Sequence, residues 1–134
     1  MAAADALGLE IHDSRELLRL VRQGLPFACL DRLALVLALE LGGLAELLQI
    51  STRTLARRRQ SGQLSAVESD RAARVARVWS HALRVFGASE RALAWLKREN
   101  MALGGVVPLS LLDTDLGVSQ VDDSLTRIEH GVFA

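Results

Sequence analysis

The stretch from Ser65 to Gly87 has no proline and no internal glycine, and it restricts the fold more than any other part of the chain. Ser65 followed three positions later by Glu68 fits a capping box, which marks the start of a helix. Apolar residues then recur at helical spacing, and Gly87 stands where helices commonly end. We therefore expect the longest helix at about 66–86. Its predicted core residues are Val67, Ala72, Val75, Ala76, Val78, Trp79, Ala82, Leu83 and Phe86.

The rest of the chain also favours helices over strands. Half of the residues are apolar, the aromatic fraction is 4%, and the chain has only two prolines. Residues 1–12 are weakly patterned and expected to be frayed. Further helices are expected at 14–23 after an Asp13 cap, 27–41 up to a break at Gly42-Gly43, 44–49, and 52–61 after a Ser51 cap. In the last third we expect a helix from a Ser89 cap through Leu96 that ends by Asn100, a single turn at Pro108–Leu112, and a helix at 118–130 after a polar turn at 113–117. The predicted fold class is all-α, with about seven helices.

Charge is segregated along the chain although the formal net charge is zero. Residues 51–77 hold seven arginines against Glu68 and Asp70, a balance of 7 − 2 = +5. Residues 99–134 hold one arginine against six carboxylates, a balance of 1 − 6 = −5. This distribution is typical of a chain with a nucleic-acid face and a separate protein-facing end. Two solvated faces of different charge remain the alternative.

The spacing of residues 41–60 resembles a helix-turn-helix. Its apolar and small positions are filled by Leu44, Ala45, Leu48, Ile50 and Leu55. In this motif the second helix enters the major groove with its N-terminal residues at base edges. Two residues depart from the pattern: Gln49 stands at the usual turn glycine, and Arg58 stands at a position that is usually apolar.

The motif predicts which side chains meet DNA. Those expected to face the bases are Thr52, Arg53, Arg57 and Gln60, and those expected to serve phosphates are Arg58, Arg59 and either Arg71 or Arg74. Specific binding by a unit of this size normally requires a homodimer that reads two half-sites. The competing interpretation of the arginines is a solvated helix face.

Other functional classes find little support in the sequence. Cys29 is the single cysteine and is interpreted as a core residue, and no cysteine and histidine cluster has the spacing of a metal site. His81 is interpreted as a packed or surface residue rather than a base, and the glycine pairs lack a phosphate-loop context. We expect no enzyme, cofactor or metal. No signal peptide is visible and the apolar run 33–48 is interrupted, so a cytoplasmic protein without a membrane segment is expected.

The C-terminal third carries the most specific pattern. Its marker residues are Ala94, Trp95, Leu96, Asn100, Leu103, Gly105, Pro108, Leu109, Leu111, Leu112, Thr114, Gly117, Val121, Leu125, Arg127, Ile128, Glu129, Gly131 and Val132. Over about 89–133 this segment resembles the toxin-binding domain of the MbcA/ParS/Xre antitoxins, and the upstream motif resembles the Xre-like helix-turn-helix. The expected organisation is a DNA-binding region at 1–65, then a region at 66–134 that contains the toxin-binding domain at about 89–134.

The resemblance implies a type II antitoxin that blocks the active site of a RES-domain, NAD-consuming toxin and autoregulates its operon. The implied partners are the cognate toxin and operator DNA, in a homodimer and a higher-order toxin–antitoxin complex. The implied toxin contacts are Thr114, Asp115, Arg127, Glu129, His130 and Val132, whereas Pro108, Leu109, Leu112, Val121, Leu125 and Ile128 are expected to pack the segment. A stand-alone dimeric helix-turn-helix regulator with a C-terminal dimerisation domain is the alternative.

Overall fold

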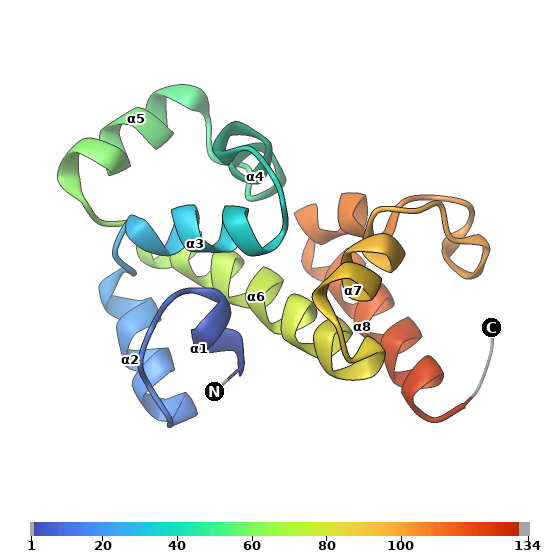
Figure 1. The fold of residues 1–134 in the computed structure, drawn as a ribbon. Coiled ribbons are helices and arrows are strands. Elements are labelled where there is room, and N and C mark those ends of the chain that lie inside the picture. Colours follow the sequence, from blue (N-terminus) through green and yellow to red (C-terminus); the bar gives the residue numbers. More distant parts are fainter. Residues whose placement is uncertain (1, 132–134) are drawn as a thin grey trace. The chain divides into compact units, whose positions relative to one another are not determined.

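A computed structural model describes residues 2–131 of the chain (Figure 1). The chain divides into two compact units between Arg77 and Val78. The described residues form helices and turns with two isolated β-bridges and no sheet, which confirms the predicted all-α fold class.

The first unit contains α1 to α5 and the first part of α6. The bounds are α1 Ala2–Ala6, α2 Ser14–Gln23, α3 Ala28–Val36, α4 Leu41–Leu47, α5 Thr52–Ser61 and α6 Ala66–Phe86. Leucines fill its centre, because Leu25, Leu30, Leu33, Leu37 and Leu44 are all completely buried. The unit therefore has its own apolar core, built largely from α3, α4 and the segment before them.

The expectation that residues 1–12 fray is wrong. Met1 lies outside the described residues; α1 comprises Ala2–Ala6, a turn follows at residues 7–8, and α1 packs against α3. The buried residues of this segment are Ala3, Ala4, Ala6, Leu7 and Ile11. A run of alanines has weak hydrophobic patterning, yet its small side chains allow close packing against a neighbouring helix, and only the tertiary fold shows that contact.

The boundary between α3 and α4 also differs from the prediction. The chain leaves the helix at Leu37 and turns at Ala38, which has a φ of +52°. Gly42 and Gly43 do not break a helix; they lie in the first turn of α4. Glycine lowers helix propensity without forbidding the conformation, and the buried Leu44 and Ala45 that follow hold this turn in place.

Two predicted caps are confirmed by their hydrogen bonds. The Asp13 carboxylate accepts a 2.8 Å bond from the Arg15 backbone N–H at the start of α2. At α6 the capping box is reciprocal: Glu68 Oε1 accepts from Ser65 N at 2.9 Å, and Ser65 Oγ accepts from Glu68 N at 3.2 Å. The start of α6 is thereby fixed by local sequence.

The second unit contains the rest of α6, α7 Ser89–Leu96, the 3₁₀ turns η1 Met101–Leu103 and η2 Pro108–Asp113, and α8 Asp115–Glu129. α8 packs against both 3₁₀ turns, and η2 also contacts α7. Its large buried side chains include Trp79, Leu96, Leu112, Val121 and Leu125. The predicted packing roles of Leu112, Val121 and Leu125 agree with this burial.

Three local predictions in α6, α7 and α8 are wrong. Ser89 is the first helical residue of α7 rather than its cap, a place taken by Ala88. Residues 115–117 are the first turn of α8 instead of a polar turn, since Thr114 caps that helix. Val67, predicted to lie in the core, is 59% exposed. It stands in the first turn of α6, where the apolar stripe extends beyond the buried surface.

Candidate functional site

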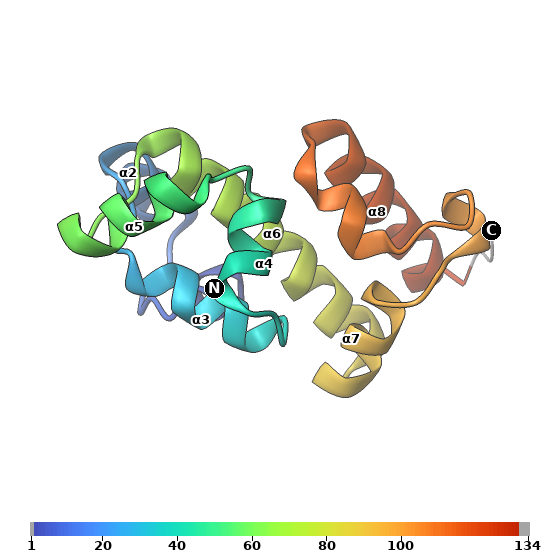
Figure 2. The same ribbon diagram turned by 90° about the horizontal axis from the view of Figure 1, so that it is seen from above.

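α4 and α5 form a helix-turn-helix whose turn has the expected geometry without glycine. Gln49 has a φ of +58°, a left-handed conformation, and Ile50 beyond it is buried. Ser51 then caps α5, because its Oγ accepts a 3.1 Å hydrogen bond from Thr54 N. Figures 1 and 2 show the two helices joined by this short turn at a large angle to each other. The departure at Gln49 leaves the motif intact.

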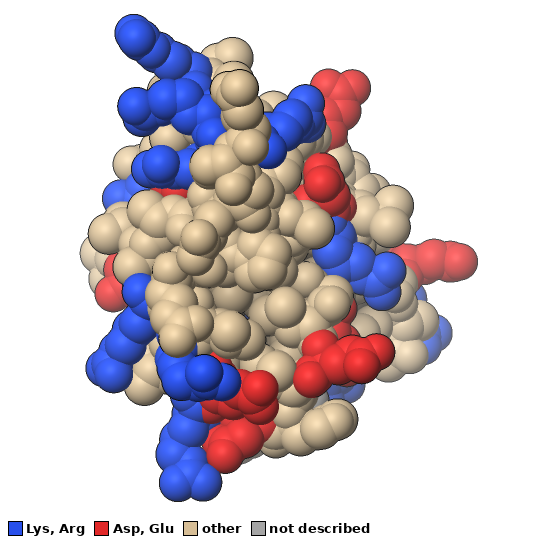
Figure 3. Space-filling model, turned by 90° about the vertical axis from the view of Figure 1, so that its left-hand side faces the viewer, with Lys and Arg blue, Asp and Glu red and all other residues tan. Residues whose placement is uncertain are grey.

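α5 presents its predicted base-facing side chains to solvent. Thr52, Arg53, Arg57 and Gln60 are all exposed, and no side chain of α5 is fully buried. In Figure 3 basic side chains gather at the upper edge of the face shown, where Figure 1 places α5. This arrangement suits a polyanion, since the guanidinium groups keep their donors on the solvent side.

The arginines predicted to serve phosphates have different surroundings. Arg59 is exposed, and its guanidinium carbon lies 5.6 Å from the centroid of the Phe27 ring, a cation–π contact. Arg71 donates a 3.2 Å hydrogen bond to the Leu48 carbonyl at the end of α4, and Arg74 pairs with Asp70 at 3.5 Å. Arg71 therefore satisfies a helix C-terminus inside the unit.

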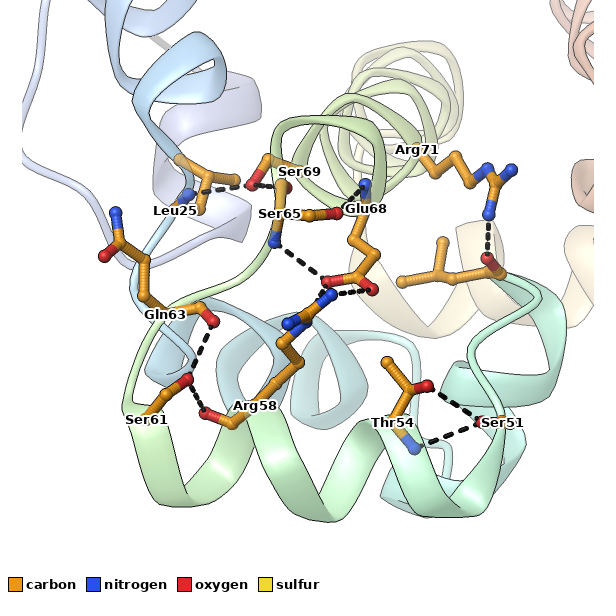
Figure 4. A network of polar contacts seen from close by, with 11 residues as sticks. Leu25, Ser51, Thr54, Arg58, Ser61, Gln63, Ser65, Glu68, Ser69 and Arg71 are labelled. Carbon is orange, nitrogen blue, oxygen red and sulfur yellow. Dashed lines mark hydrogen bonds and ion pairs between the residues drawn. The ribbon is translucent and has the colours of Figure 1, made fainter.

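Arg58 is bound to a carboxylate within the unit. Its Nε lies 2.8 Å from Glu68 Oε1 and its Nη2 lies 3.2 Å from Glu68 Oε2, a two-point contact visible in Figure 4. Burial raises the pKa of Glu68, but the hydrogen bonds from Arg58 and Ser65 outweigh it and hold that pKa below its usual value. The sequence marked Arg58 as unusual, and its partner shows why it replaces an apolar residue.

The start of α8 is built with little steric freedom. Thr114 Oγ1 accepts a 3.0 Å hydrogen bond from Gly117 N, which caps the helix. Gly117 itself is buried, and a Cβ added there would collide with the Leu111 carbonyl oxygen. The η2 turn and α8 thus approach more closely than any other residue at this position would allow.

His81 lies in a polar cluster that the sequence did not predict. The side chain is buried, with Nδ1 2.6 Å from Asp122 Oδ1 and Nε2 3.3 Å from Glu129 Oε1. Arg84 donates through Nε to the other Glu129 oxygen at 3.2 Å. The hydrogen bonds from Arg84 and His81 lower the pKa of Glu129. These contacts join the second-unit part of α6 to α8.

The implied toxin contacts are distributed unevenly over α8. Asp115, Arg127 and His130 are exposed, whereas Thr114 is the helix cap and Glu129 belongs to the His81 cluster. Val132 lies outside the described residues. Leu116, which the sequence did not single out, is 72% exposed in the first turn of α8. Leu116 thus adds exposed apolar surface to the first turn of α8, next to the exposed Asp115.

The described residues also limit what else the chain can hold. Between residues 2 and 131, no three His, Cys, Asp or Glu side chains are grouped to bind a metal ion. Within the same range no helix is both long and apolar enough to cross a lipid bilayer. Cys29 is buried, and this burial raises the pKa of its thiol to about 11.

Comparison with known proteins gives matches over both units. Residues 16–77 match the model of the antitoxin Xre-like helix-turn-helix domain, and residues 81–131 match that of the antitoxin Xre/MbcA/ParS C-terminal toxin-binding domain.

Individual relatives carry antitoxin names. An antitoxin Xre of Photorhabdus laumondii is 35% identical over 117 residues, covering 86% of this chain and 79% of the relative. An antitoxin Xre of Yersinia enterocolitica is 32% identical over 130 residues, covering 96% and 88% respectively. A Prs ADP-ribosylating antitoxin of a Sphingobium species is 45% identical over 49 residues, covering 37% and 31%.

Proposed function

The chain belongs to the Xre/MbcA/ParS family of antitoxins, and we propose that it neutralises a RES-domain toxin through the α8 region while α5 reads the operator of its own operon. Membership of this family makes the chain a type II antitoxin with a DNA-binding helix-turn-helix domain. The identity of the toxin, the contact residues and the homodimeric state are the proposed parts. The match of residues 81–131 to a toxin-binding domain is the observation that carries the proposal.

On the DNA side, we assign base contacts to Thr52, Arg53, Arg57 and Gln60, and a phosphate contact to Arg59. The support is their exposure on a helix capped by Ser51 at the correct place in the motif. Arg53→Ala and Arg57→Ala should each weaken operator binding by about 1–3 kcal/mol if each makes a bidentate base contact. Mobility shifts with a duplex from the chain's own promoter measure this, and unchanged binding by both variants would move the reading surface elsewhere.

On the toxin side, Asp115, Leu116, Arg127 and His130 form the proposed contact surface, named here the α8 surface. Three of these residues are polar and exposed, and Leu116 supplies an apolar anchor. On this surface the Asp115 carboxylate and the Arg127 guanidinium offer one charge of each sign, so individual charge pairs with the toxin would fix the register of the complex, not a net acidic charge. The Sphingobium relative's name refers to ADP-ribosylation, a reaction that takes its donor group from NAD, and this supports an NAD-consuming target.

The toxin assignment is tested by co-expression with the product of the gene beside this chain's own, which the proposal expects to be a RES-domain toxin. The unsubstituted antitoxin should restore growth, whereas Leu116→Asp combined with Arg127→Glu should restore much less. Point substitutions are preferable to removal of α8, because Val121 and Leu125 are wholly buried and their loss would expose the core of the second unit. Arg98→Glu, a charge reversal at an exposed residue of the second unit outside α8, is the matched control. Full rescue by the double variant would place the contact on another surface.

A stand-alone transcriptional regulator whose second unit only dimerises is the alternative function. It shares the α5 assignment and differs in needing no toxin. A neighbouring gene for a RES-domain protein favours the antitoxin, and failure of the unsubstituted chain to restore growth against that protein favours the regulator. In both functions the chain acts by binding, so we propose no reaction catalysed by the chain itself.

A further inference from the structure

The recognition helix α5 is attached to its unit mainly by polar contacts. Leu55 is only half-buried, and no side chain of α5 is fully buried. An apolar residue at the position of Arg58 would normally supply the anchor in this motif, and here the ion pair with Glu68 takes its place. The orientation of α5 therefore depends on a contact that has direction and charge, rather than on burial of apolar surface alone.

The Arg58–Glu68 contact continues into the body of the unit, as Figure 4 shows. Glu68 is 8% exposed, and Oε1 accepts hydrogen bonds from both Arg58 Nε and Ser65 N. At the next residue of α6, Ser69 Oγ accepts a 2.8 Å bond from Leu25 N and donates a 2.7 Å bond to Ser65 O. A continuous chain of hydrogen bonds thus joins the middle of α5 to the first turn of α6 and to the α2–α3 connection.

Glu68 places a carboxylate beside the arginine-rich helix α5 and holds one of its arginines. We propose that Glu68 is a positioning residue for DNA reading: it strengthens DNA binding by holding Arg58 and, through Arg58, the reading face of α5. A carboxylate in a basic DNA-binding unit should by Coulomb repulsion weaken association with phosphates. Because this carboxylate holds Arg58 in place, its loss should instead lower the affinity for DNA. The proposal rests on the assignment of α5 as the reading helix.

Glu68→Gln is the central variant of the test. Glutamine can still accept the Ser65 N–H and complete the capping box, but it removes the charge that holds the guanidinium. The probe is a labelled duplex from the promoter of the chain's own operon, titrated by fluorescence anisotropy from about 50 to 200 mM salt. We expect affinity to fall about three- to tenfold, with the slope of log affinity against log salt unchanged, because no phosphate contact is lost.

Asp70→Asn is the matched control. Asp70 lies two positions along the same helix, its side chain is 61% exposed, and its partner is Arg74 rather than a residue of α5. Removal of this charge should leave affinity unchanged or slightly higher. If Glu68→Gln binds as tightly as Asp70→Asn or the unsubstituted protein, the positioning role is overturned.

Arg58→Lys separates positioning from phosphate contact. Lysine keeps the positive charge but cannot make the two-point contact with Glu68. Positioning predicts that this variant binds DNA as weakly as Glu68→Gln with an unchanged salt slope. The proposal is overturned if Arg58→Lys binds as tightly as the unsubstituted protein and Arg58→Ala lowers the salt slope by about 0.9. Those two results would make Arg58 a phosphate contact.

Two further measurements distinguish a displaced helix from other failures. A stoichiometric titration gives the active fraction, which falls for a partly unfolded variant and stays complete for a folded protein with a displaced α5. If a lower active fraction accounts for the whole loss of binding by Glu68→Gln, the variant is partly unfolded and the proposal is overturned. Arg53→Ala and Arg57→Ala test the premise: if both variants bind normally, α5 does not read DNA, and the DNA-reading assignment and the positioning role fail together. If only Glu68→Gln binds normally, the positioning role alone fails.

Discussion

Gln49 has a φ of +58° in the turn between α4 and α5. A side chain with a Cβ is strained in this conformation, which glycine adopts at no steric cost. The turn nevertheless forms, since the buried Leu48 and Ile50 on either side and the cap at Ser51 determine the path of the chain. At the scale of the residue, packing overrides an unfavourable local preference.

Gln49→Gly should therefore stabilise the protein, because it relieves roughly 1 kcal/mol of left-handed strain. We expect a higher thermal unfolding midpoint by circular dichroism. Ala56→Gly is the matched control. Ala56 is exposed within α5, and glycine introduced there should lower the free energy of unfolding by about 1 kcal/mol. A Gln49→Gly protein that melts as low as the control would mean that the glutamine side chain contributes more than its strain costs.

Gly117→Ala should destabilise the second unit by about 1–3 kcal/mol. The added Cβ meets the Leu111 carbonyl oxygen, a backbone atom that cannot rotate away. Gly42→Ala is the control: Gly42 lies in α4 with no atom within 4 Å of the added Cβ, so alanine should stabilise. Chemical denaturation of both variants measures the difference, and equal stability would contradict the close approach of η2 and α8.

Between elements, polar side chains join separate helices of the same unit. The second-unit part of α6 meets α8 through His81, Asp122, Glu129 and Arg84. In the first unit, α5 meets α6 through Arg58 and Glu68. Each of these contacts spans a separation that helical periodicity does not reveal, which is why the sequence placed His81 on a helix without identifying its partners.

The lowered pKa of Glu129 predicts the acid dependence of stability. Because this carboxyl titrates below its ordinary value of 4.5 in the folded state, its contribution is present above pH 4.5 and is lost as the pH falls through the lower folded value. Glu129→Gln should lower the melting temperature near pH 7, and its difference from the unsubstituted protein should shrink below pH 4.5. Asp123→Asn, exposed on the same helix, serves as control. A difference that is constant with pH would exclude the ion pair as its source.

At the scale of the whole molecule, the two compact units divide near the boundary between the two family matches. The chain divides between Arg77 and Val78, and the matched segments are 16–77 and 81–131. The exposed arginines of α5 belong to the first unit, and the α8 surface belongs to the second. This division predicts that promoter binding and toxin neutralisation can be lost separately.

Arg53→Ala with Arg57→Ala should remove most promoter binding and still restore growth against the toxin. Leu116→Asp with Arg127→Glu should do the reverse. Both pairs are measured in both assays, mobility shift and growth rescue, with comparable amounts of protein confirmed by immunoblot. Loss of both activities in either pair would show that the two functions depend on a shared structure or assembly.

Much of the helical architecture was readable from the chain itself. Capping residues, terminal glycines and apolar periodicity act over a few residues, and they placed α2, α5 and α6 within a residue or two of their observed bounds. Local charge located the arginine-rich helix, and the motif at 41–60 predicted a helix-turn-helix. These features are encoded where they occur, so no long-range contact is needed to recognise them.

Only the tertiary structure decided which of these residues are committed to the protein's own fold. It paired Arg58 with Glu68, placed Thr114 as the cap of α8 and enclosed His81 between two carboxylates. It also buried Ala3, Ala4 and Ala6 of α1 and left Leu116 in solvent. Sequence periodicity indicates which side chains share a helix face, but the residues that pack against this face lie elsewhere in the chain. These residues determine whether a side chain contacts the protein's own fold or stays exposed for a binding partner.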